Sequence, residues 1–168
     1  MSSGLRRIAL TVHVTASVGW LGAVAAFLVL AVSGLNSQDR QLAAAAYLAA
    51  NLITWTLIVP LSVAALVTGV VQSVGTAWGL ARHYWVLIKL VLTVVATALL
   101  LLHTEPIGAL AAAATDGAVL APEFMSRRRQ MVVDAAAAVL LLLVTTVLAV
   151  CKPRGLTRYG TRRRQGSR

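Results

Sequence analysis

The sequence predicts an all-α membrane protein, a single bundle of four transmembrane helices. The chain has 168 residues, of which 59% are hydrophobic and 12% are charged. A soluble domain is about half apolar and about a quarter charged, so this composition is typical of a membrane protein. Four segments stay apolar for roughly 20 residues, the length that a helix needs to cross a bilayer. No segment shows the alternation of apolar and polar residues that is typical of barrel strands.

The four spans form one transmembrane domain over residues 1–151. We predict them at about Ile8–Ser33, Tyr47–Val71, Tyr84–Leu102 and Met131–Val150. The first span follows two arginines, as a secretory signal would. Its apolar stretch is far longer than the roughly 7–15 residues of a signal core, so we predict a span that is not cleaved.

The connection between the third and fourth spans, about Thr104–Gln130, is the one long loop that the sequence predicts. We expect Glu105 and Pro106 to end the third helix, because the residue before a proline avoids helical conformation. The middle of this loop reads GALAAAATDG, residues 108–117. We expect it to form either a short interfacial helix or no stable structure.

The basic residues indicate topology and lipid contact. The net charge is +10, and seven of the fifteen basic residues lie in the tail that begins at Lys152. We therefore predict that the tail, residues 152–168, is disordered and contacts anionic lipids, and we expect no nucleic-acid partner. Four spans place both termini on one side with ten basic residues, against four on the other side, which include Arg127–Arg129. The positive-inside rule then predicts cytoplasmic termini.

The first span carries polar and small residues in its middle, in the stretch HVTASVGWLG. His13, Ser17 and Trp20 are spaced i, i+4 and i+7, which places them on one helix face. Gly19 and Gly22 allow a partner helix to approach closely. An ionisable residue at membrane depth is costly, so His13 is a candidate functional residue.

A layer of polar residues is expected at the depth of His13. Counted from the arginine before each span, His13 and Lys89 lie at nearly equal depths, on the order of 10 Å from one membrane face. Thr68 and Thr145 reach a similar depth on the other two spans. Trp85 shares a helix face with Lys89. The alternative for Lys89 is that its stem snorkels towards the headgroups.

A second polar layer is expected near the opposite face. His103 ends the third span, Asp134 opens the fourth, and Asn51 lies early in the second. A contact between His103 and Asp134 would fix the tautomer of the imidazole. The alternative for His103 is simple solvation near the membrane surface.

These residues favour haem b as a cofactor. A four-helix bundle can enclose a haem with an axial histidine, aromatic side chains against the porphyrin and a cation for a propionate. We assign His13 as the metal ligand, Lys89 to a propionate, and Trp20 and Trp85 to the porphyrin, with Ser17 beside them. No second histidine lies at this depth, so we expect a single histidine ligand with an exchangeable sixth ligand, or no haem.

Other chemistries find less support in the sequence. Copper sites prefer clusters of methionine and cysteine, and here three methionines and the single Cys151 are scattered. One cysteine also excludes an intrachain disulfide. The HExxH zinc motif, the phosphate-binding loops and a Ser-His-Asp candidate are absent from the sequence.

Two stretches, HVTASVGWLG and HYWVLIKLVLTVVATALLLLH, resemble the CopD-like group of bacterial membrane proteins. This group includes the copper-resistance CopD family and the HemJ-type protoporphyrinogen oxidases. The sequence is most similar to a four-span branch, domain-of-unknown-function family 2269, in LVTGVVQSVGTAWGLARHYWVLIKL and in the end KPRGLTRYG. The resemblance covers the first three spans and the junction after the fourth.

The resemblance implies a location in the bacterial cytoplasmic membrane and adds roles for two residues. The HemJ-type proteins imply that His13 is associated with haem and that Lys89 is its essential basic partner. The CopD family implies copper passage, and the four-span branch implies a fold without an activity.

Three hypotheses follow, with no enzyme class assigned. The first is a haem-b-binding or redox-associated membrane protein. The second is a structural or accessory protein in which His13 and Lys89 hydrogen-bond between helices. The third is a copper-related permease. The expected partners are the lipid bilayer and either a second copy of the chain or a membrane redox protein.

Overall fold

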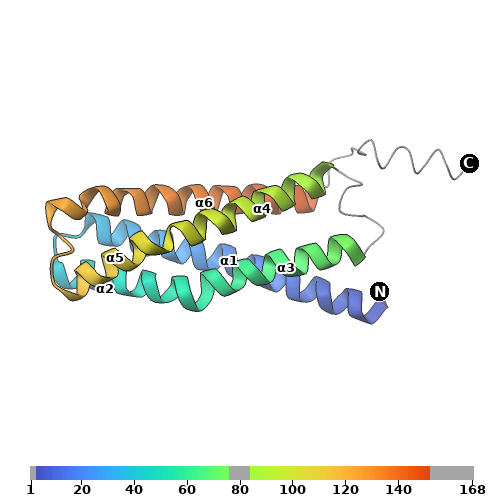
Figure 1. Cartoon of the computed structure of the whole chain (residues 1–168), viewed down its shortest axis with the longest axis horizontal. Coiled ribbons are helices and arrows are strands. Elements are labelled where there is room, and N and C mark those ends of the chain that lie inside the picture. The colour runs from blue at the N-terminus through green and yellow to red at the C-terminus, as the bar shows by residue number, and fades with distance from the viewer. Residues whose placement is uncertain (1–2, 76–83, 152–168) are drawn as a thin grey trace, which may run out of the picture.

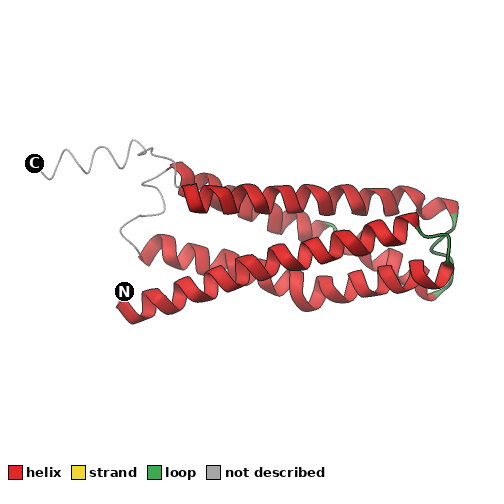
Figure 2. Cartoon of the chain, turned by 180° about the vertical axis from the view of Figure 1, so that it is seen from behind, coloured by secondary structure: helices red, strands yellow, loops and turns green. Residues whose placement is uncertain are grey.

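The computed structural model describes residues 3–75 and 84–151, and it is an all-α bundle (Figure 1). Four helical segments are long and apolar enough to cross a membrane, which confirms the predicted fold class. The described chain begins and ends at the same end of the bundle (Figure 1). Most described loop residues lie at the opposite end (Figure 2). The predicted tail, residues 152–168, lies outside the described residues.

Short elements join into the four spanning segments. In chain order the elements are α1 (Ser3–Asn36), α2 (Arg40–Ile53), the π-helix η1 (Thr54–Ile58), α3 (Val59–Gly75), α4 (Tyr84–Leu102), α5 (Thr104–Thr115), the 3-10 helix η2 (Pro122–Phe124) and α6 (Met125–Cys151). The second spanning segment contains α2, η1 and α3, and the third contains α4 and α5.

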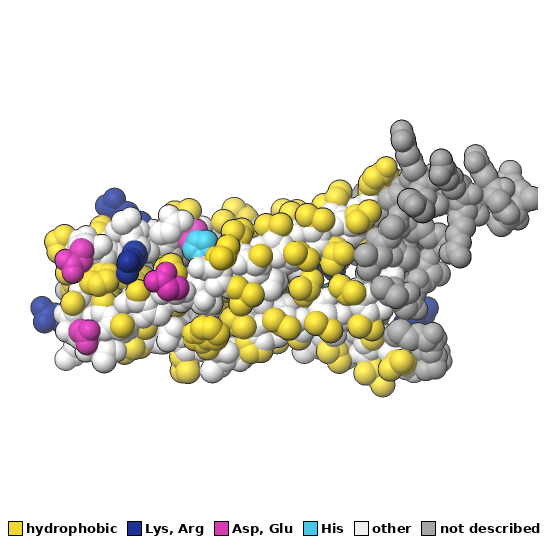
Figure 3. Space-filling model, in the orientation of Figure 1, with side chains coloured by type: hydrophobic (Ala, Val, Ile, Leu, Met, Phe, Trp, Pro, Cys, Tyr) yellow, Lys and Arg dark blue, Asp and Glu magenta, His cyan; other side chains and the backbone are white. Residues whose placement is uncertain are grey.

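The helices are longer than the spans that the sequence predicts. Helix α1 has 34 residues, about 51 Å at the helical rise per residue, whereas the hydrocarbon core of a bilayer is about 30 Å thick. The bundle therefore extends beyond the hydrocarbon core. On the face that Figure 3 shows, charged side chains gather at the end that holds α2 and α5, and hydrophobic side chains cover the middle. This distribution fits a bundle in lipid.

Small residues allow the helices to pack closely. Ala16, Ala23 and Ala31 of α1 are buried in the core. A Cβ added to Gly19 would lie 3.3 Å from a side-chain carbon of Leu61 on α3, so this glycine allows α1 and α3 to approach as the sequence predicts. The same prediction is wrong for Gly22, where an added Cβ would meet no atom within 4 Å among the described residues. Small residues serve this purpose in membrane bundles because close backbones gain van der Waals contact.

Residues Thr104–Thr115 of the predicted connection form α5, so of the two alternatives for its middle the helix is the one present. The expectation that Glu105 avoids helical conformation before Pro106 is wrong, because both residues lie within α5. This helix packs mainly against α2 and buries Leu110 among alanines. Pro106 lies in the first turn of α5, where a missing N–H costs no helical hydrogen bond. The regular helix is interrupted at His103, between α4 and α5, where the backbone has φ −92° and ψ 0°. Alanine has the highest helix propensity, and buried small faces on both helices stabilise the segment.

Arg128 is buried, although the sequence predicts this arginine among the basic residues of an exposed connection. It is 2% exposed, and its Nη2 donates to the carbonyl oxygens of Gly34 at 2.7 Å and Leu35 at 3.0 Å. Its Nε donates to the hydroxyl of Tyr47 at 3.1 Å. The last carbonyls of a helix have no partner within it, and a cation there also interacts favourably with the helix dipole. Arg128 thus caps the end of α1.

Gly34 makes room for this arrangement. A Cβ at this position would lie 2.8 Å from Cζ of Tyr47, closer than carbon atoms pack. Tyr47 is fully buried, and its ring lies beneath the guanidinium of Arg128 at 5.9 Å from the ring centroid. The glycine, the tyrosine and the arginine therefore form one packed unit at the end of α1.

We predict that Arg128→Met lowers the midpoint of thermal unfolding of the protein in detergent. The change leaves the Tyr47 hydroxyl and two carbonyl groups without their donor, at a cost of roughly 2–4 kcal/mol. The matched control is Arg129→Met, because Arg129 is the exposed neighbour, and we expect it to change stability by less than about 0.5 kcal/mol. Equal shifts of the unfolding midpoint in the two variants would contradict the assignment of Arg128 as the cap of α1.

Candidate functional site

His13 on α1 bonds to Thr68 on α3. The distance from His13 Nδ1 to Thr68 Oγ1 is 3.0 Å. The Thr68 hydroxyl donates its proton to the carbonyl oxygen of Ala64 at 2.5 Å. A hydroxyl has one proton to donate, so Thr68 accepts from His13, and Nδ1 carries the N–H.

The other ring nitrogen of His13 faces a cation. Nε2 lies 3.4 Å from Nζ of Lys89 on α4. An ammonium group only donates, so Nε2 presents its lone pair to Lys89. The partners of the two nitrogens thus assign a neutral imidazole with the proton on Nδ1, a state that follows from the contacts rather than from visible hydrogens.

Helix α3 holds the His13 ring in place. A Cβ added to Gly69 would lie 3.2 Å from Cε1 of His13, so the absence of a side chain leaves space for the ring. Four positions after Thr68 on α3, the Gln72 amide also contacts α1 and donates to the carbonyl oxygen of Ala9 at 2.8 Å. The hydrogen bond to Thr68 and the packing against Gly69 therefore hold the imidazole ring in place.

The charge at this site is positive. His13 and Lys89 are partly buried, and within the described residues no carboxylate forms an ion pair with Lys89. A lone ammonium beside a neutral imidazole favours an anionic group, because a carboxylate would form a charge-assisted hydrogen bond there.

The other residues predicted at this depth have separate surroundings. Ser17 is half-buried, one turn further along α1. Trp20 is 4% exposed and lines a cavity described below. Trp85 lies in the first turn of α4, and its side chain is outside the described part of the structure. Thr145 is buried and donates to the carbonyl oxygen of Leu142 on its own helix.

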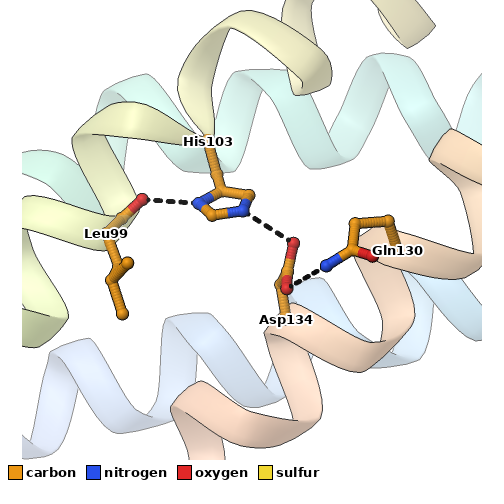
Figure 4. Close-up of polar contacts among 4 residues, drawn as sticks. All are labelled: Leu99, His103, Gln130 and Asp134. Carbon is orange, nitrogen blue, oxygen red and sulfur yellow. Dashed lines mark hydrogen bonds and ion pairs between the residues drawn. The ribbon is translucent and has the colours of Figure 1, made fainter.

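A second polar site lies at the break between α4 and α5. His103 Nε2 is 3.1 Å from Oδ2 of Asp134 on α6. Its Nδ1 donates to the carbonyl oxygen of Leu99 at 2.7 Å, and the Gln130 amide donates to Oδ1 of Asp134 at 2.7 Å (Figure 4). The contact that the sequence predicts between His103 and Asp134 is therefore present.

The geometry of this pair requires a proton between the two residues. The Nδ1–H of His103 is used by a carbonyl group, so a neutral ring would turn the lone pair of Nε2 towards the carboxylate. Two lone pairs repel each other, so a hydrogen bond between these two atoms needs a proton on Nε2 or on Oδ2. Asn51 lies elsewhere on α2, and its Oδ1 is buried without a hydrogen-bond partner among the described residues.

A cavity of about 470 Å³ adjoins the second site. Its walls come from α1, η1, α4, α5 and α6, and most of the lining is apolar. The polar lining includes His103, Gln130 and Asp134. This cavity could not be predicted from the sequence, because its walls combine residues of five helical elements whose relative rotation no local pattern gives.

The described residues contain few clusters of side chains that bind metals. Within residues 3–75 and 84–151, no group of three or more histidine, cysteine, aspartate or glutamate side chains could hold a metal ion. Cys151 is exposed at the end of α6. His13 presents one ring nitrogen, Nε2, on the side of Lys89.

The chain matches no protein-family model, no curated protein and no solved structure.

Proposed function

We propose that this multi-pass membrane protein binds haem b, or acts in a haem-related redox process, with His13 as the single axial ligand. The observation that carries the proposal is the state of the His13 ring. Nε2 bears the lone pair, and Nδ1 donates to Thr68. Histidines that bind metals commonly donate their other ring N–H to a neighbouring acceptor, which fixes the ring and increases its basicity.

The residues around His13 fit this cofactor in two respects. Lys89 supplies a cation beside the ligand nitrogen, and a haem propionate is a carboxylate that a lysine can pair with. Lysine has a flexible stem, so the ammonium can leave Nε2 for a propionate. A bound haem would supply one-electron chemistry. The protein would supply the ligand, the counter-charge and the apolar surroundings that tune the potential.

A structural or accessory role is the second candidate, and one observation favours it. His13, Thr68 and Lys89 already satisfy one another across α1, α3 and α4. Hydrogen bonds between membrane helices contribute on the order of 0.6 kcal/mol each. In this role the contact would join the three helices and bind nothing. A copper-related permease has less support, because the described residues add no cluster of ligands to His13.

The location that we propose is the cytoplasmic membrane of a bacterium, with both termini in the cytoplasm. The basis is the resemblance to bacterial membrane proteins and the excess of basic residues in the loop and tails on that side. The basic tail would contact anionic lipids, and the protein partner would be a second copy or a membrane redox protein.

We predict that the detergent-purified protein, expressed with ample haem, has a Soret band that shifts on reduction with dithionite. His13→Ala is expected to abolish the band, because it removes the iron ligand. Lys89→Met is expected to keep the ligand and weaken haem retention, because it removes the counter-charge for a propionate.

His103→Ala is the matched control, since His103 is a half-buried histidine of the other polar site. We expect it to leave the haem spectrum unchanged. A protein without a Soret band would contradict haem binding, and the structural role would then be the better candidate. A band that survives His13→Ala would show that haem has a different ligand.

A second prediction concerns topology. We predict that a reporter that works only in the cytoplasm is active when it is fused after Arg168. The reason is that four spans return the chain to the side on which it starts. A reporter that requires export, fused at the same position, should be inactive. The reverse pattern would contradict the proposed orientation.

A further inference from the structure

We propose that the cavity between α4, α5 and α6 binds a lipid-soluble ring compound that carries a carbonyl or hydroxyl oxygen, of the quinone and quinol type. The oxygen would lie at the His103–Asp134 pair. His13 does not line this cavity, so the proposal goes beyond the proposed haem site and does not depend on it.

The size and walls of the cavity suit such a ligand. Ligand pockets have volumes of roughly 300–1,000 Å³, with mostly apolar walls and a few convergent polar groups, and this cavity has about 470 Å³. Trp20 and Phe27 of α1 form part of its inner wall and are nearly buried, at 4% and 6% exposed. Aromatic rings favour flat ring ligands, because offset or edge-to-face contact is attractive.

The polar end of the cavity can bind an oxygen in either redox form of the ring. A carboxylate has about four sites for hydrogen bonds, and within the described residues Asp134 accepts from Gln130 and contacts His103. It can therefore also accept from a hydroxyl group. The Gln130 amide has a second N–H besides the one that it donates to Asp134, and this N–H can be donated to a carbonyl group.

The opening of the cavity favours a ligand from the bilayer. Leu99 on α4 is 47% exposed and lines the cavity, and exposed Ala137 lines it from α6. Both belong to the apolar spanning segments, whose exposed side chains contact lipid. Exposed Glu105 and Arg127 also line the cavity. A molecule with an apolar body and a polar ring, such as a quinone, matches this lining.

A π-helix forms another wall. Thr54 and Ile58, the first and last residues of η1, line the cavity and are buried. The π-helix is rare and is found frequently at functional sites. The hydroxyl of Thr54 donates to the carbonyl oxygen of Ala50, so the polar atom is satisfied by its own helix and this wall needs no polar ligand group.

The rival occupant is a phospholipid acyl chain. Such a chain would fill the apolar part, but it has no hydrogen-bonding group to place at His103 and Asp134. Binding of a quinone should therefore saturate and depend on Asp134. Occupation of the cavity by acyl chains of the bilayer should do neither.

The test titrates decylubiquinone into the protein in phosphatidylcholine nanodiscs and follows tryptophan fluorescence, which quinones quench. One variant keeps only Trp20, which lines the cavity, and the other keeps only Trp55, which is 54% exposed and does not line it. The remaining tryptophans are changed to phenylalanine. We expect saturable quenching of Trp20, and for Trp55 quenching that grows with the quinone dissolved in the lipid.

Four substitutions in the Trp20-only background complete the test. Ala138→Phe fills the cavity, Asp134→Asn removes the carboxylate, and each should weaken binding at least about fivefold, the effect of losing one hydrogen bond or its equivalent in contact. The matched control for the first is Val133→Phe, on the same helix, 61% exposed and outside the lining. His13→Ala should leave binding unchanged.

Three results would overturn the proposal. Quenching of Trp20 that does not saturate would show simple partition into lipid. Equal affinity in the Ala138→Phe and Val133→Phe variants would show that the quinone binds elsewhere. Saturable binding that Asp134→Asn leaves unchanged would show that the polar pair does not bind the oxygen.

Discussion

The structure depends on one constraint, that hydrocarbon offers no hydrogen-bond partners, so polar groups within the spans must find them in the protein. Most spanning threonines meet it locally, as Thr54 does by donating to the carbonyl oxygen of Ala50. Other polar side chains meet it between helices, as the Gln72 amide of α3 does by donating to the carbonyl oxygen of Ala9 on α1. Arg128 of α6 caps the end of α1, and His13 of α1 bonds to α3 and α4. These contacts fix the relative positions of the helices at the two ends of the bundle.

The contact at His13 is a directed chain of hydrogen bonds. Lys89 donates to His13, His13 donates to Thr68, and Thr68 donates to the carbonyl oxygen of Ala64. Each donor has its proton fixed by the next acceptor, and bonds in such chains polarise one another. The chain therefore does more than satisfy polar groups, because it leaves His13 neutral with a basic nitrogen beside a cation. A neutral ring with its lone pair on Nε2 is what an iron ligand needs once the ammonium of Lys89 leaves that nitrogen for a propionate, and this ring state is the physical basis of the proposed function.

Depth along the helices could be predicted from the sequence, and rotation about them could not. Equal residue counts from one membrane face give equal depths because the rise per residue is constant, and His13, Thr68 and Lys89 do meet. Thr145 was expected at the same depth, yet it bonds to its own helix. A helix over the middle of α5 was one of two alternatives from the sequence, but its extension back to Thr104 and the burial of Arg128 could not be predicted, for a related reason. Helix α5 depends on packing against the alanine-rich face of α2, and the burial of Arg128 depends on the carbonyl groups at the end of α1. Both partners lie far away in the sequence, so local patterns do not reveal them.

The position of the proton on His13 tests this arrangement most directly. In protein labelled with ¹⁵N-histidine and free of haem, the nitrogen shifts of the ring report which nitrogen is protonated, and the loss of signals in His13→Asn identifies the residue. We expect a neutral ring with the proton on Nδ1 at neutral pH, and a loss of this preference in Thr68→Val, which removes the acceptor. A proton on Nε2, or a ring protonated on both nitrogens, would contradict the hydrogen-bond chain and with it the site.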